Sequence, residues 1–172
     1  MSITSIYRPQ PEIYRFAPWL LVTIVLLSVL AQVYLPLYFS FISLLDLPLL
    51  VVIYFGINRR NPSTGLLLGC FIGLFQDALS GQFIGQFGMA KTVVGFLASS
   101  LSTRVDTDSA TTRALLVFLF FLLQNLIFEG GRILLLNQES QLLSLQIVKA
   151  ALVNPIVGVL LFSQLDRFRK VS

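Results

Sequence analysis

The hydrophobic and polar positions of the chain form long apolar stretches separated by short polar connections. Six apolar stretches lie near residues 17–38, 43–57, 63–80, 88–101, 114–136 and 145–164. Apolar runs of roughly 18 or more residues are typical of transmembrane helices. The second, third and fourth stretches are shorter, so we expect neighbouring helices to shield them or the bilayer to thin around them. The pattern predicts an all-α, polytopic membrane protein that is a bundle of six transmembrane helices.

The cations in the connections can all be placed on one side of this predicted membrane. The connections after the first, third and fifth stretches carry no Lys or Arg. Short loops rich in Lys and Arg stay in the cytoplasm during insertion, so both ends are predicted to be cytoplasmic. We expect a tail over residues 1–16, one transmembrane domain over 17–166 and a basic tail over 167–172. The nine cations are Arg8, Arg15, Arg59, Arg60, Arg104, Arg113, Arg167, Arg169 and Lys170.

Composition supports the membrane interpretation. Hydrophobic residues make up 56% of the chain and charged residues 12%, and the mean hydropathy is +0.85. A soluble domain uses roughly 25% charged residues to cover its surface. The first stretch could pass for a secretory signal, but its apolar run continues to Leu35 and five more stretches follow, so we interpret it as a retained helix. The net charge of +4 comes from the predicted cytoplasmic ends and does not indicate a nucleic-acid partner.

Six further charged residues fall inside the predicted helices, each near the outer end. A charge at the centre of a transmembrane helix costs about 2.5–3.5 kcal/mol on insertion scales, so such groups usually face the bundle and pair. Two interpretations stay open. The residues form a structural ion-pair network, or they line an outward-facing polar cavity that binds a small solute or a partner's helix. The six are Asp46, Asp77, Lys91, Glu129, Arg132 and Lys149.

The residue types needed for common catalytic sites are missing from the chain. It contains no His, which rules out Ser-His-Asp and Cys-His arrangements and removes the commonest metal ligand. No Gly-rich loop followed by Lys and Ser or Thr is present to bind phosphate. Asp77 and Glu129 could act as paired carboxylates, but the nearby cations would keep both ionised. We therefore predict a protein that is not an enzyme and uses no metal or cofactor.

Glycine recurs at every fourth position of the third stretch, at Gly65, Gly69 and Gly73. Glycines at this spacing lie along one face of a helix and allow another backbone to approach closely. The face is expected to pack against another helix, either within the chain or in a partner.

The connection between the third and fourth stretches, from Ser80 to Gly88, carries no formal charge. Its glycines permit left-handed backbone, so the connection could fold over an outer cavity as a lid. The alternative is a tight turn at the lipid headgroups. We expect Phe83, Ile84 and Phe87 to sit at the outer interface.

The segment GLFQDALSG, from Gly73 to Gly81, is followed by Gly85. It resembles the signature of the rod shape-determining protein MreD family, a Gly-Leu-x-x-Asp-x-x-x-Gly stretch that closes the third span. The chain length of 172 residues, the six stretches, the Asp46-Leu47-Pro48 start of the second span and the Asn154-Pro155 pair are also similar to the family. The motif residues carried over are Asp77, Gly81 and Gly85.

The resemblance implies a non-catalytic scaffold subunit of the cell-elongation (rod) complex in the bacterial inner membrane. Such a subunit associates with MreC and, through it, with MreB, RodA and the elongation-specific penicillin-binding transpeptidase, and so helps organise peptidoglycan synthesis. The family also resembles the six-helix S-components of energy-coupling-factor transporters.

Two other functions are therefore considered, a small-solute-binding subunit of such a transporter and a flippase-like carrier of a lipid intermediate. S-components typically have an Ala-rich face on the first helix. Here the run from Trp19 to Leu35 is dominated by Leu, Val and Ile, which favours the scaffold.

Overall fold

The computed structural model describes residues 14–15, 18–81, 83–105, 107, 109–136, 144–168 and 170–171. Most of the predicted tail over residues 1–16 and part of the tail over 167–172 therefore lie outside the described residues.

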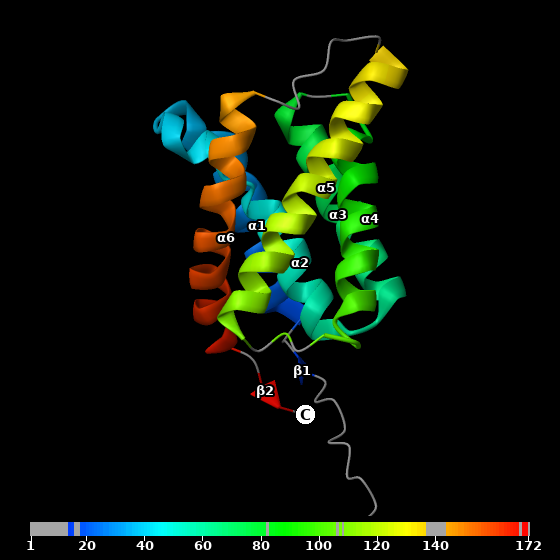
Figure 1. Cartoon of the computed structure of the whole chain (residues 1–172), viewed down its shortest axis with the longest axis vertical. Coiled ribbons are helices and arrows are strands. Elements are labelled where there is room, and N and C mark those ends of the chain that lie inside the picture. Colours follow the sequence, from blue (N-terminus) through cyan, green and yellow to red (C-terminus); the bar gives the residue numbers. More distant parts are fainter. Residues whose placement is uncertain are drawn as a thin grey trace, which may run out of the picture.

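Helices make up nearly all of the described chain, which confirms the all-α prediction. The α-helices are α1 (Pro18–Tyr34), α2 (Leu47–Arg59), α3 (Pro62–Ser80), α4 (Gln86–Leu101), α5 (Ala110–Leu136) and α6 (Leu145–Asp166). Two short 3-10 helices, η1 (Leu35–Leu37) and η2 (Ser40–Leu44), connect α1 to α2. The helices run up and down along the long axis of the molecule (Figure 1). We call the end where α1, α3 and α5 finish the upper end, and the opposite end the lower end.

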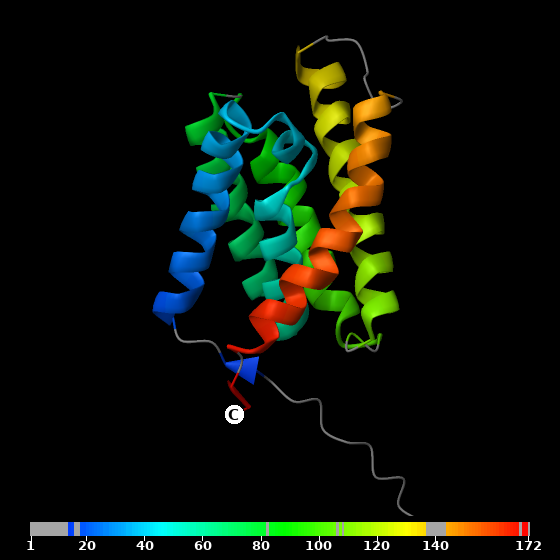
Figure 2. The same cartoon turned by 90° about the vertical axis from the view of Figure 1, so that its left-hand side faces the viewer.

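The two ends of the described chain meet at the lower end. Strand β1 (Tyr14–Arg15) pairs antiparallel with strand β2 (Lys170–Val171), with Tyr14 opposite Val171 and Arg15 opposite Lys170. Both strands lie below the bundle in Figures 1 and 2. The segments that precede α1 and follow α6 are thus on the same side of the bundle.

The centre of the bundle is α2. Every residue from Pro48 to Asn58 is buried, because α1, α3, α4, α5 and α6 all contact this helix. In the described residues, four helical segments are long and apolar enough to cross a membrane: Trp19–Leu37, Pro62–Ser80, Ala110–Leu134 and Leu145–Asp166. Helix α2, with 13 residues, is apolar but shorter, and α4 has 16 residues.

The turn between α2 and α3 follows from its local sequence. Arg60 ends α2 in left-handed backbone, with a φ of 51°. The side chain of Asn61 then caps α3, because its Oδ1 accepts the N–H groups of Ser63 and Thr64 at 3.0 and 3.4 Å. Pro62 occupies the first turn of α3, where a missing N–H leaves no helical hydrogen bond unmade.

The glycine face of α3 packs against α4 within the chain. A Cβ atom added at Gly65 would meet the carbonyl oxygen of Gly95 well inside van der Waals contact. One added at Gly69 would collide with the carbonyl of Lys91, and one at Gly73 with the carbonyl of Phe87. Of the two alternatives given by the sequence, the structure thus uses this face for internal helix packing.

The connection between α3 and α4 is shorter than the sequence indicated. Helix α4 begins at Gln86, so Phe87 and Gly88 are helical. Phe87 is half-buried and stacks on Phe128 with 4.6 Å between ring centroids, instead of lying at the outer interface as predicted. The first turn of α4 needs apolar cover where it faces α5, and Phe87 provides it. Phe83 and Ile84 are exposed, as expected.

Candidate functional site

A buried group of three polar side chains joins α2, α4 and α5 near the upper end. Lys91 Nζ donates to Asp46 Oδ2 at 3.0 Å and to Gln124 Oε1 at 2.7 Å. Gln124 Nε2 also donates to Asp46 Oδ2, at 2.6 Å. The three groups therefore form a closed ring of hydrogen bonds that contains one positive and one negative charge.

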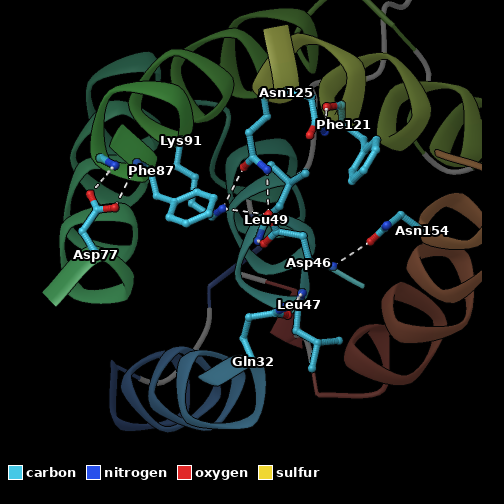
Figure 3. A network of polar contacts seen from close by, with 12 residues as sticks. Gln32, Asp46, Leu47, Leu49, Asp77, Phe87, Lys91, Phe121, Asn125 and Asn154 are labelled. Atoms are coloured by element: carbon cyan, nitrogen blue, oxygen red, sulfur yellow. Dashed lines mark hydrogen bonds and ion pairs between the residues drawn. The ribbon is translucent and has the colours of Figure 1, made fainter. Parts of the chain in front are cut away.

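Asp46 also holds the start of α2 in place. As the N-cap residue, it accepts the N–H of Leu49 through Oδ1 at 2.9 Å. Its own N–H donates to Asn154 Oδ1 at 2.9 Å, which joins α2 to α6. The N–H of Leu47 donates to Gln32 Oε1 at 3.0 Å, which joins α2 to α1 (Figure 3). The Asp46 turn is thus fixed by side chains from four other helices.

Lys91 is enclosed completely, with 0% of the residue exposed. Besides its two polar partners, its Nζ lies 4.7 Å from the ring centroid of Phe87. An aromatic face attracts a cation electrostatically. A buried ammonium is tolerated only when it is paired and hydrogen-bonded, and all three contacts contribute to that here.

Asp77 is 1% exposed, and the structure places it against backbone rather than against a cation. Its Oδ2 accepts the N–H groups of Gly85 and Gly88 at 2.9 and 3.0 Å, and its Oδ1 accepts that of Phe87 at 3.1 Å. These N–H groups lie at the N-terminus of α4, where helix donors lack intrahelical partners and negative charge is favoured. Gly81 and Gly85 both have positive φ, at 65° and 104°, so the motif is a tight turn closed by the aspartate.

The remaining three predicted residues do not join the Lys91 group. Glu129 pairs with Arg132 on the same helix, with 2.9 Å between Arg132 NH1 and Glu129 Oε1. Lys149 is exposed on α6 and makes no ion pair or hydrogen bond with the described residues. The structure thus brings together Asp46 with Lys91 and Glu129 with Arg132, and leaves Asp77 and Lys149 apart from both pairs.

Two adjoining cavities open beside these groups at the upper end. The first, which we call the upper cavity, has a volume of about 270 Å³ and lies among α2, α5, α6 and η2. The second, the lateral cavity, has a volume of about 450 Å³ and lies between α1 with η1 and α3. Gln32, Gln76 and Phe87 line both cavities. Gln76 is only 4% exposed, yet its Oε1 has no hydrogen-bond partner among the described residues.

A separate polar group ties the lower end together. Arg113 NH1 lies 2.6 Å from Asp166 Oδ2, and Arg113 Nε donates to the carbonyl of Thr107 at 2.7 Å. Tyr54 Oη donates to Asp166 Oδ1 at 3.1 Å. The sequence analysis placed Arg113 only among the cytoplasmic cations, whereas the structure uses it together with Asp166 to join α2, α5 and α6.

Sequence reasoning considered charged residues and overlooked most of the amides. Gln32, Gln76 and Gln124 take part in the site, and each stands in an apolar stretch where an unpaired amide would be costly. Their location in apolar stretches is the feature of the sequence from which they could have been predicted. In the described part of the chain, the buried charged side chains of Asp46, Asp77, Lys91 and Glu129 are all hydrogen-bonded.

The chain matches the family model described as rod shape-determining protein MreD over residues 14–163. No curated protein and no solved structure matches it. The matched region covers most of the chain and includes all six helices up to the last turn of α6. Together with the four helices that are long and apolar enough to cross a membrane, this match indicates a multi-pass inner-membrane protein with a role in determining rod shape. The chain belongs to the MreD family of rod shape-determining proteins.

Proposed function

We propose that this chain is a non-catalytic membrane scaffold that binds MreC within the bacterial rod complex, and through it helps organise MreB, RodA and the elongation-specific transpeptidase. The observation that carries the proposal is the family match over residues 14–163. The described structure supports it by presenting helical surface and short connections, while its buried charges are ion-paired or hydrogen-bonded inside the bundle. Such a surface is suited to contact with other membrane proteins.

We further propose that all six helices cross the bilayer, in an arrangement like that of the S-components. Helix α2 is about 20 Å long and α4 about 24 Å, both short of the roughly 30 Å hydrocarbon core. The burial of α2 by the other helices supports its crossing, because a helix enclosed by protein does not need to match the lipid. The domain covers residues 17–166, and the tails over 1–16 and 167–172 are cytoplasmic, which makes the lower end the inner end.

The docking surface for MreC is proposed to be the groove between α1 and α6, which we call the α1/α6 groove. Among the four long apolar helices, α1 is the least covered: 11% of its apolar segment is buried, against 28–33% for the other three. The groove measures about 270 Å³, and Ser28 and Ala31 supply small side chains that let a second helix approach closely. Figure 2 shows α1 and α6 on either side of α2. Its full lining is Ile24, Leu27, Ser28, Ala31, Leu47, Val51, Leu161 and Leu165.

The test is affinity purification of the tagged full-length protein from a rod-shaped host in mild detergent, followed by identification of the proteins that co-elute. MreC is expected in stoichiometric amount. The amount of MreC should fall when its single transmembrane helix is exchanged for an unrelated one. Recovery of a transporter ATPase without any elongation protein would overturn the scaffold proposal in favour of the solute-binding alternative.

A further inference from the structure

The connection between α1 and α2 exposes a row of large apolar side chains. We call residues 35–44, which comprise η1, η2 and the two residues between them, the aromatic connection. It lies at the upper end of the bundle, and Figure 1 shows it projecting sideways. Large apolar side chains that are exposed together mark a surface that contacts a protein or a membrane. Four of them are between 60% and 80% exposed: Leu37, Tyr38, Phe39 and Phe41.

Charge is absent from this part of the chain. No Asp, Glu, Lys or Arg occurs from Phe16 to Leu45. The apolar segment of α1, which begins at Trp19, continues through η1 to Leu37. The chain therefore enters the aromatic connection without the charged break that accompanies an exit into water. This continuity indicates that the connection stays in contact with the membrane that α1 crosses.

The level of the aromatic connection agrees with the edge of a bilayer. Helix α3 has 19 residues and is about 28 Å long, close to the roughly 30 Å hydrocarbon core. Its two ends therefore mark the two edges of the core, and the aromatic connection lies at the upper one (Figure 1). At the lower edge, Arg60 and Arg104 follow α2 and α4. Aromatic side chains are enriched where the hydrocarbon core meets the headgroups, so the upper edge has the composition of such an interface.

The inner side of the aromatic connection is fixed to the bundle. Asn154 Nδ2 donates to the carbonyl of Leu44 at 2.8 Å, and η2 contacts α6. Ser43 and Leu44 line the upper cavity. The exposed rings of Tyr38, Phe39 and Phe41 line neither the upper nor the lateral cavity. One side of the connection thus forms a wall of the upper cavity, and the other side carries the exposed rings.

We propose that the aromatic connection is an interfacial anchor, which lies along the membrane surface with the rings of Tyr38, Phe39 and Phe41 among the headgroups and the adjoining acyl chains. Its partner is the lipid surface itself, because an uncharged segment with amphipathic rings suits this layer. Insertion sets the depth of α1 and holds the wall of the upper cavity at the interface. The proposal requires only that α1 crosses the membrane, and it does not depend on MreC binding.

The test is the depth of a tryptophan placed at position 38. Trp19 is the only tryptophan of the chain, so Trp19→Phe with Tyr38→Trp gives a single indole. The full-length protein is reconstituted in phosphatidylcholine vesicles that contain lipids brominated at different depths. Quenching is expected to be strongest about 15 Å from the bilayer centre, the edge of the core, and iodide on both sides should quench little. Strong quenching by iodide, or strongest bromine quenching at the bilayer centre, would overturn the proposal.

A tryptophan at the lower end is the matched control. Thr103 is exposed beside Arg104, so Thr103→Trp in the Trp19→Phe background should be quenched by iodide and not by the brominated chains. Co-reconstitution with MreC separates lipid from protein as the partner. An indole at position 38 that is open to iodide in vesicles and becomes protected only when MreC is present would assign the surface to a protein, which would also overturn the anchor.

A second pair of variants tests whether the rings hold the connection in place. Replacing both Phe39 and Phe41 by Asp should draw the connection into water and raise iodide quenching at position 38 severalfold. Replacing both by Leu should leave the quenching unchanged. Both rings are exposed, so neither change removes a core contact, and size-exclusion chromatography in detergent confirms folding. Unchanged quenching in the folded Asp variant would contradict the anchor.

Discussion

The carboxylate of Asp77 accepts the N–H of Gly85 at 2.9 Å, eight residues further along the chain, where Gly85 has a φ of 104°. This relationship accounts for two of the three motif residues. The aspartate needs the turn to close so that it can reach the start of α4, and the turn needs glycine because side chains rarely adopt this φ. The same carboxylate accepts two more N–H groups from the first turn of α4.

Replacing Asp77 should therefore disrupt the turn and the start of α4. Asp77→Ala leaves three backbone N–H groups without their acceptor in a poorly hydrated region. We therefore expect the free energy of unfolding to fall by on the order of 3 kcal/mol. Thermal unfolding monitored by size-exclusion chromatography should show a lower midpoint and less folded protein. Lys91→Met should not restore it, since Lys91 is paired elsewhere. Restoration by Lys91→Met would mean that Asp77 acts as a counter-ion instead.

The Asp46–Lys91 pair should behave as a coupled unit. Lys91→Met leaves a buried carboxylate without its cation, and breaking such a pair typically costs about 3–5 kcal/mol. Asp46→Asn keeps a side-chain acceptor at the N-cap of α2 but leaves the buried Lys91 ammonium without its anionic partner. The double variant should be more stable than the sum of the two single losses predicts. Additive losses would show that the two charges do not interact energetically.

Glycine substitutions separate internal packing from partner binding. Gly69→Ala should lower the yield of folded protein, because its Cβ would collide with the backbone of Lys91. Gly130→Ala is the matched control, since a Cβ there has no heavy atom within 4 Å. Fluorescence-detected size-exclusion chromatography compares the two. Normal folding of Gly69→Ala combined with loss of MreC would assign this face to a partner instead.

Much of the fold could be predicted from the sequence because membrane helices are defined by long apolar runs. The sequence pattern did not predict where α4 begins. The side chain of Asp77 accepts the N–H of Phe87, which stabilises a helix start at Gln86 and makes Phe87 helical. The charged residues of the site could be predicted because an unpaired charge in lipid is energetically costly. Their hydrogen-bond partners could not be predicted. Gln124 completes the Lys91 group from 33 residues away, and no local pattern indicates such a contact.

Cysteine labelling tests the proposed orientation. In a Cys70→Ala background, a cysteine at Ile84, exposed at the upper end, should react with a membrane-impermeant thiol reagent in intact cells. One at Ser109, exposed at the lower end, should react only after the membrane is permeabilised. The reverse pattern would invert the orientation and place both tails outside the cytoplasm.

The most direct test of the scaffold account compares two neighbouring leucines of α1. Leu27 lines the α1/α6 groove and is 61% exposed, whereas Leu26 lines an apolar groove between α1 and α3, on the other side of α1, and is 41% exposed. Both positions accept Trp without disturbing the core, so co-purification of MreC and cell shape can be measured with equal amounts of folded protein. The account predicts that Leu27→Trp loses MreC and lets cells round up, while Leu26→Trp retains MreC and rod shape. Retention of MreC by folded Leu27→Trp protein would contradict docking in this groove.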